Sequence, residues 1–121
     1  MLTGTQTWTF SNHPAILSTG VVGGPFEKNG PLKEDFDKCF DDLWIEQNSY
    51  EKAQKVLIEE AVQVALQKQE LKEKDIQFFI GGDLINQITP TSFAARTNQI
   101  PYLGLFSACA TSMESLALTA F

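Results

Sequence analysis

"IQFFIGGD", residues 76–83, is a continuous apolar run that is too short for a typical helix and that ends in two glycines and an aspartate. Such a run is typical of a strand buried on both faces of a parallel sheet. A helical pattern follows in "TSFAARTNQ", residues 91–99, and a second extended run, "YLGLFSA", follows Pro101. A strand, a helix and a strand in close succession predict a βαβ unit. The expected fold class is therefore α/β.

A longer helix is predicted ahead of this unit, over "NSYEKAQKVLIEEAVQVALQ", residues 48–67. Asn48 and Glu51 have the spacing of a capping box. The apolar residues of the helix share one face: Ala53, Val56, Leu57, Ala61, Val64 and Ala65. We expect this face to pack against a sheet.

The N-terminal third is less regular. Two short strands are expected in "TQTWTF" and in "AILSTGVVGG", and a surface loop in "GGPFEKNGPL", residues 23–32, which lacks the ending of a phosphate-binding P-loop. Helical spacing of apolar residues then predicts a helix over residues 32–44, with Cys39 beside the apolar stripe as a core residue.

The composition limits the classes of function. The 121 residues are 43% hydrophobic, which suits one domain with a core. The net charge of −6 and the lack of a Lys/Arg cluster argue against a nucleic-acid partner. No apolar run approaches the roughly 18 to 20 residues that span a bilayer, and the N-terminus does not resemble a signal peptide.

No metal site is predicted. Cys39 and Cys109 are far apart in the sequence and lack metal-ligand spacing, so we expect both to be free thiols. Four aspartates between residues 35 and 42 lack the glycine and the terminal glutamate of a calcium loop. A solvated face explains them better.

Cys109 is the first candidate site residue. It lies where the second extended run meets a predicted helix whose apolar face contains Met113, Leu116, Ala117 and Ala120. The N–H groups and dipole of such a helix start favour a thiolate and also bind carboxylates. Its small neighbours permit a tight elbow between strand and helix. Cys109 is therefore a nucleophile, a ligand-site residue or an ordinary core cysteine. A nucleophile needs a base, and the only histidine, His13, lies in an N-terminal His-Pro turn.

Asp83 and Arg96 are the other candidates. Asp83 follows the first strand of the βαβ unit at its carboxyl end, where open α/β sheets bind ligands, but a helix cap or a turn explains an aspartate there equally well. Arg96 either pairs with a ligand carboxylate or faces solvent on its helix.

The chain ends within the predicted helix that follows Cys109, without a helix stop signal. We therefore expect residues 1–121 to be the N-terminal piece of a longer protein. "FFIGGDLINQ", "IPYLGLFSACATSMESLAL" and the βαβ order resemble the N-terminal half of the thiolase superfamily, in which the reactive cysteine begins a buried helix. The resemblance implies a layered α/β/α fold with a mixed, largely parallel sheet, and it places Cys109 at the position of that cysteine.

A closer resemblance, through "GTQTWTF", "GPFEKNGPL", "FDKCFDD" and "ACATSME", is to a group of thiolase-like sporulation proteins from endospore-forming bacteria. It implies a protein of the spore that binds pyridine-2,6-dicarboxylate (dipicolinate) without a cofactor and supports its uptake into the developing spore. The implied partners are membrane proteins of the same operon, at the spore inner membrane, and a second copy of the chain. Cys109 and Asp83 would line the pocket, and Asp83 would contact a bridging Ca²⁺, orient a donor or be protonated.

The alternative function is an acyltransferase related to ketoacyl synthases and thiolases, in which Cys109 attacks an acyl-CoA. Two departures weaken this alternative. "SACATS" has a serine where relatives often have glycine, and the half of the fold that supplies the histidines or asparagine of active enzymes is not part of these 121 residues. Binding without turnover is therefore the leading expectation.

Overall fold

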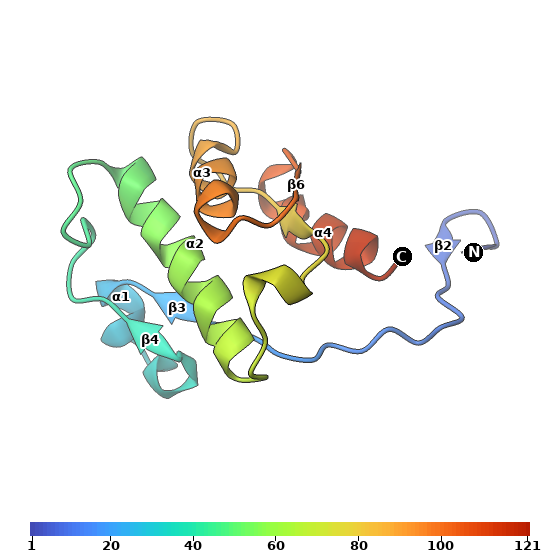
Figure 1. Cartoon of the computed structure of the whole chain (residues 1–121), viewed down its shortest axis with the longest axis horizontal. Helices are drawn as coiled ribbons and strands as arrows, with labels where there is room; N and C mark the ends of the chain where they lie inside the picture. Colours follow the sequence, from blue (N-terminus) through green and yellow to red (C-terminus); the bar gives the residue numbers. More distant parts are fainter.

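The predicted βαβ unit is present. In the computed structural model, which describes residues 1–121, β5 (Phe79–Gly81) and β6 (Tyr102–Gly104) are parallel, and α3 (Thr89–Asn98) connects them. α3 packs against β6 and α4 (Thr111–Thr119) packs against β5, so this two-stranded sheet lies between two helices (Figure 1). Two more two-stranded sheets are present, one parallel and one antiparallel, so the chain is mixed α/β, which is compatible with the expected class. The three sheets are separate, whereas the resemblance implies one mixed, largely parallel sheet.

The longest helix, α2 (Tyr50–Gln67), packs closely on α3. Small side chains fill their interface, because Ala53, Ala94 and Ala95 are at most 3% exposed. The predicted start of this helix is wrong by one residue. Ser49 is the N-cap, and its Oγ accepts a hydrogen bond from the N–H of Lys52 at 3.3 Å. Since the first helical residue is Tyr50, the Ser49 hydroxyl is the one placed to reach the third N–H.

The helix predicted over residues 32–44 does not form. Instead, β4 (Lys38–Cys39) pairs in parallel with β3 (Val22–Gly23), and a short helix α1 (Pro25–Lys28) and the 3₁₀ turn η1 (Lys33–Asp35) lie between them. The strand hydrogen bonds explain the difference, because main-chain groups of residues 37–40 bond to the segment 21–23. Long-range pairing thus overrides the local apolar spacing.

The N-terminal hairpin of β1 (Leu2–Thr3) and β2 (Thr7–Trp8) stands apart from the body of the molecule (Figure 1). It meets the C-terminus, where the ring of Phe121 contacts the rings of Trp8 and Phe10 edge to face, with centroids 5.3 and 5.4 Å apart. The predicted N-terminal strands are therefore confirmed only at Thr7–Trp8 and Val22–Gly23.

An extended segment leads from the hairpin across the end of α2 (Figure 1). Gly20 lies against the carbonyl group of Ala61 in that helix, and a Cβ at this position would overlap the carbonyl oxygen. Only glycine permits this approach of the two main chains.

The core is small. Seven apolar side chains are buried: Ile45, Ala53, Leu66, Pro90, Ala94, Ala95 and Ile100. The strand β5 is only half-buried and the preceding Phe78 is 64% exposed, so the predicted burial on both faces is not met. In addition, β5 pairs with only one strand, β6, so its other edge has no neighbouring strand. None of the helices combines the length and the apolarity that a membrane-spanning helix needs.

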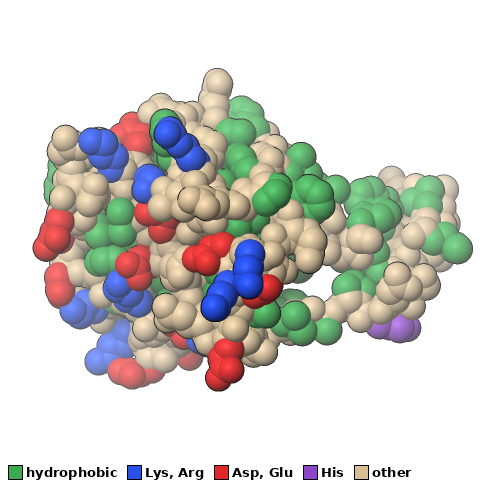
Figure 2. All heavy atoms as spheres, in the orientation of Figure 1, with side chains coloured by type: hydrophobic (Ala, Val, Ile, Leu, Met, Phe, Trp, Pro, Cys, Tyr) green, Lys and Arg blue, Asp and Glu red, His purple; other side chains and the backbone are tan.

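Charged side chains are unevenly distributed. On the face drawn in Figure 2 they gather over α1, β4 and α2 on the left, whereas the N-terminal hairpin on the right presents apolar and neutral groups. The ammonium group of Lys68, just after α2, joins three segments of the charged side. Its Nζ lies 2.6 Å from Oδ1 of Asp37 and donates to the carbonyl of Thr19 at 2.9 Å, and Oδ2 of Asp37 accepts from the N–H of Val21 at 2.9 Å.

We predict that Asp37→Asn destabilises the chain at neutral pH and not in acid. The hydrogen bond from Lys68, followed by that from the Val21 N–H, lowers the pKa of Asp37 below its usual value. A lowered pKa contributes stability above the unfolded-state pKa, which is lost as the pH falls through the folded-state pKa. Urea unfolding at neutral pH and at about pH 2 would measure this. Asp35→Asn, at an exposed carboxylate nearby, is the control, and equal effects of both variants at both pH values would contradict the prediction.

Candidate functional site

The carboxyl ends of the two parallel strands bring the candidate residues to one edge of the sheet. The N–H of Leu105 donates to the carbonyl of Gly81 at 2.9 Å. A Cβ at Gly82 would overlap the carbonyl oxygen of Leu105 and lie 3.2 Å from Cγ2 of Thr111. The loop after β5 and the loop after β6 therefore touch, and glycine at position 82 makes this contact possible.

Cys109 lies on the elbow between β6 and α4. Ala108 has a φ of 50°, in the left-handed region, and residues 108–110 form the 3₁₀ turn η3 that leads into α4. The Oγ1 of buried Thr111 accepts a hydrogen bond from the N–H of Ser107 at 3.3 Å and closes the elbow. Cys109 at its apex is exposed, so it is not a core cysteine in this chain. No side chain caps the first turn of α4.

Asp83 is buried and fully engaged. Its side chain is 7% exposed. One carboxylate oxygen accepts from the N–H of Ile85 at 3.0 Å, and the other accepts from the N–H of Thr91 at 2.9 Å and from the Thr91 hydroxyl. Thr91 is the third residue of α3, and no side chain at its N-cap position makes a capping bond. Asp83 therefore caps α3 from a distance, and its negative charge lies at the positive end of the helix dipole.

The bonds of Asp83 also close a strained turn. Asn86, Gln87 and Ile88, between Asp83 and α3, have φ values of 49°, 53° and 65°. Each non-glycine residue in this region costs about 1–2 kcal/mol, so three in succession persist only where other contacts hold the turn. The hydrogen bonds at its two ends, to Ile85 and Thr91, supply such contacts.

Sequence reasoning missed two residues beside Asp83. Thr91 is 2% exposed and provides two of the three donors to the carboxylate. Tyr102 on β6 donates its hydroxyl to the carbonyl of Gly81 at 3.1 Å. Burial raises the pKa of Tyr102, and the charge of Asp83 raises it further. Pro90, in the first turn of α3, was the signal that could have located Thr91, because proline favours helix starts.

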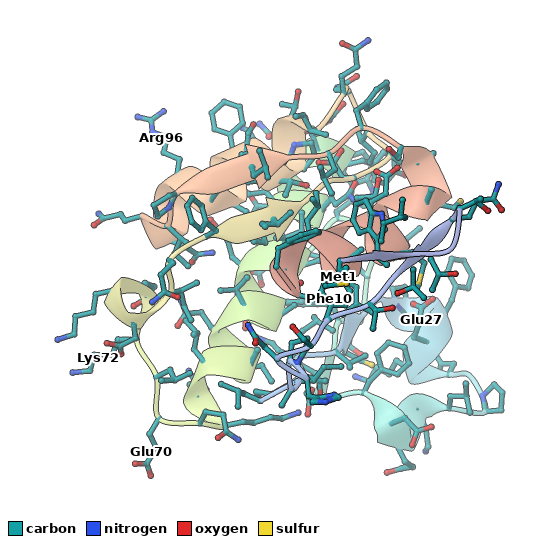
Figure 3. The ribbon with its side chains drawn as sticks, turned by 90° about the vertical axis from the view of Figure 1, so that its right-hand side faces the viewer. Met1, Phe10, Glu27, Glu70, Lys72 and Arg96 are labelled. Carbon is teal, nitrogen blue, oxygen red and sulfur yellow. The ribbon has the colours of Figure 1, made fainter.

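Arg96 lies away from the other candidates. It is in the last turn of α3, whereas Asp83 caps the first turn, so the helix separates the two residues. The side chain is exposed, makes no ion pair and projects outward from the molecule in Figure 3. The structure thus brings Asp83 and Cys109 to one edge of the sheet and leaves Arg96 at the other end of α3.

A cavity of about 770 Å³ lies beside α4, but it is apolar. Most of its lining comes from the segment 10–18, the end of α2 and α4, whose predicted apolar face, Met113, Leu116, Ala117 and Ala120, is confirmed here. Figure 3 shows Phe10, one of the lining residues, in front of α4. The cavity suits an apolar group and not a dianion. No three His, Cys, Asp or Glu side chains are grouped as a metal site.

A family model described as Stage V sporulation protein AD matches residues 4–121. The chain belongs to this family. The Stage V sporulation protein AD of Bacillus subtilis (strain 168) is 46% identical to it over 117 residues, which cover 97% of this chain and 35% of the relative. The chain therefore spans about a third of the length of that relative. The expected resemblance to a group of sporulation proteins is confirmed at the level of the family.

For this member of the Stage V sporulation protein AD family, we predict that Asp83→Asn lowers the free energy of unfolding by about 1–3 kcal/mol, because an amide has only one acceptor oxygen and its NH₂ group would face either the Thr91 donors or the Ile85 N–H. Thr91→Val should have a similar effect, and the double variant should lose less than the sum of both. Urea unfolding measures all three variants. Asp35→Asn is the exposed control, and an equal effect of Asp83→Asn and Asp35→Asn would refute the capping role.

We also predict that Cys109 reacts first with a chromogenic disulfide reagent under native conditions. Cys109 is exposed, whereas Cys39 is only half-exposed on β4. The reaction should be biphasic, and Cys109→Ser should remove the fast phase while Cys39→Ser removes the slow one. A fast phase that persists in Cys109→Ser would show that the elbow is not accessible in solution.

Proposed function

We propose that this chain is the N-terminal part, residues 1–121, of a thiolase-like sporulation protein that binds dipicolinate and supports its uptake into the developing spore. The observation that carries the proposal is the match to the Stage V sporulation protein AD family over residues 4–121. The parallel β5–α3–β6 unit, with Cys109 in the turn η3 that leads from β6 into α4, is consistent with a thiolase-like arrangement. Binding would need no turnover by Cys109.

The start of α4 is the anion site in this proposal. The positive end of its dipole attracts a carboxylate, and no side chain makes a capping bond there, although the N–H of Thr111 already donates to the carbonyl of Ala108. Cys109 is exposed beside this helix start. One carboxylate of dipicolinate would bind at this elbow, with Cys109 as a neighbour of the ligand and not as a nucleophile.

In this proposal Asp83 positions the loop after β5 and does not contact the ligand. Both of its oxygens already accept hydrogen bonds, and a bridging Ca²⁺ would have to displace the donors that cap α3. Of the three roles that the resemblance allows, orienting a donor fits best. Asp83 holds the loop after β5, and Gly82 in that loop contacts Leu105 in the loop after β6. Calcium would then reach the site with dipicolinate and not through Asp83.

The proposed setting is the forespore, at the surface of the spore inner membrane. Membrane proteins of the same operon, which the resemblance implies as partners, would hold the chain there. A second copy of the chain is a further proposed partner. Arg96, exposed on α3, would be a surface residue in this assembly and not a pocket residue.

One observation favours the acyltransferase as the second candidate. Cys109 is exposed, and the residue before it, Ala108, has a left-handed conformation. Nucleophiles of some enzymes are likewise found on strained turns between a strand and a helix. The apolar cavity beside α4 could hold an acyl chain. No hydrogen bond joins the only histidine, His13, to the thiol of Cys109, so the acyltransferase would need a base from another source.

Calorimetric titration with dipicolinate, with and without Ca²⁺, tests the first candidate. The 121-residue chain and the full-length B. subtilis relative are titrated in parallel. We expect saturable binding that survives Cys109→Ala. Binding should become about two- to fivefold tighter in Glu114→Gln, because this change removes a negative charge from the first turn of α4. Glu70→Gln, at a distant exposed carboxylate, is the matched control.

Two results would contradict the proposal. Absence of binding to both proteins, together with acylation of Cys109 by an acyl-CoA, would favour the acyltransferase. A dipicolinate affinity that Glu114→Gln does not change would place the ligand away from the start of α4.

A further inference from the structure

Two aromatic rings are stacked on the surface between β4 and α2. The rings of Trp44 and Tyr50 have centroids 4.4 Å apart and are inclined by 19°. Their side chains are 46% and 51% exposed, and the neighbouring Leu43 is 47% exposed. These three residues form what we call the aromatic platform, which lies at the loop between β4 and α2 in Figure 1. Large side chains grouped at the surface indicate an interaction site.

The loop that presents the platform is held in place. Oδ1 of Asp42 accepts hydrogen bonds from the N–H groups of Trp44 and Ile45 at 2.7 and 2.8 Å. The N–H of Gln47 donates to the carbonyl of Trp44 at 2.8 Å. Ile45 is only 7% exposed and anchors the loop in the core. Trp44 therefore keeps its orientation without a partner, which lowers the entropic cost of binding one.

The same loop contains backbone strain that packing alone would not favour. Ile45 has a φ of 51° and Glu46 a φ of 56°. A β-branched residue in this region is an outlier, and such residues are often found where a loop has a function. These two residues directly follow Trp44, whose indole stacks on the phenol of Tyr50 in the first turn of α2.

The charge around the platform indicates what binds to it. Residues 34–51 contain seven carboxylates and one lysine, a net charge of −6, which equals the net charge of the whole chain. The rest of the chain is therefore neutral. Three of the seven carboxylates, those of Glu34, Asp37 and Asp41, pair with lysines from outside the segment, whereas Asp42 and Glu46, next to the platform, are exposed and form no ion pair. This surface attracts a cationic partner and repels an anionic lipid.

We propose that the aromatic platform binds an arginine-bearing basic segment of a partner protein. A guanidinium group stacks on the face of an indole or phenol and pairs in its plane with carboxylates, here those of Asp42 and Glu46. A lysine ammonium group cannot stack in this way. The proposal goes beyond dipicolinate binding and does not depend on it.

The test uses the whole chain with Trp8→Phe, in which Trp44 is the only tryptophan. The probe is a labelled synthetic peptide with three arginines separated by glycine and serine, and the same peptide with lysines is the comparison. We expect the arginine peptide to quench Trp44 and to bind about threefold or more tighter than the lysine peptide. Fluorescence anisotropy of the labelled peptides gives the affinities.

Matched variants separate stacking from charge. Trp44→Ala should weaken binding of the arginine peptide about fivefold, whereas Trp44→Phe, which keeps a ring, should restore part of the loss. Glu46→Gln should weaken binding about twofold, and Glu70→Gln, at the far end of α2, should leave it unchanged. Circular dichroism confirms that each variant is folded.

Several results would overturn the proposal. Equal affinity for the two peptides, or an affinity that Trp44→Ala does not change, would show that net charge alone binds the peptide and that the rings do not stack on it. Binding of phosphatidylserine vesicles, with no binding of either peptide, would identify a membrane surface instead.

Discussion

The buried carboxylate of Asp83 joins three parts of the chain: the end of β5, the left-handed turn at residues 86–88 and the first turn of α3. A buried charge is costly unless every oxygen has partners, and here three donors surround it. The helix dipole adds to the stabilisation. Without this carboxylate the N–H groups of α3 would lack a cap and the strained turn would lose the bonds at its ends. The connection from β5 to α3, and hence the parallel pairing of β5 with β6, depends on it.

The same edge of the sheet carries a second, contrasting arrangement. The loops after β5 and β6 meet at Gly82, and beyond this contact the chain turns through Ala108 into α4. Asp83 points into the protein and is occupied, whereas Cys109 stays exposed at an uncapped helix start. Asp83 and Cys109 follow the carboxyl ends of paired strands, yet their side chains have different environments. The carboxylate of Asp83 holds its loop in place, and the elbow at Cys109 is exposed.

Charge and apolar surface are separated in this molecule. The acidic segment 34–51 surrounds the aromatic platform, while the apolar cavity lies beside α4 and the N-terminal segment. The charged region suits polar, cation-bearing contacts, and the cavity suits apolar groups. The lysine at position 68 connects the two regions, because it ties Asp37 to the segment that leads to the cavity.

Much of the fold follows from the sequence itself. The apolar run at 76–83, the helix after Ser49 and the βαβ order are encoded by local patterns, and so is the elbow of small residues around Cys109. The candidate residues at the carboxyl ends of the strands could also be predicted, because parallel strands end at one edge of a sheet.

Only the tertiary structure decided the rest. Residues 32–44 have helical spacing, yet main-chain hydrogen bonds to residues 21–23 make part of this segment a strand, and such long-range pairing is not visible in local periodicity. The role of Asp83 depended on Thr91, eight residues away, and the separation of Arg96 depended on the direction of α3. Local spacing determines which face of an element is apolar, but which groups meet across the fold depends on how the elements pack.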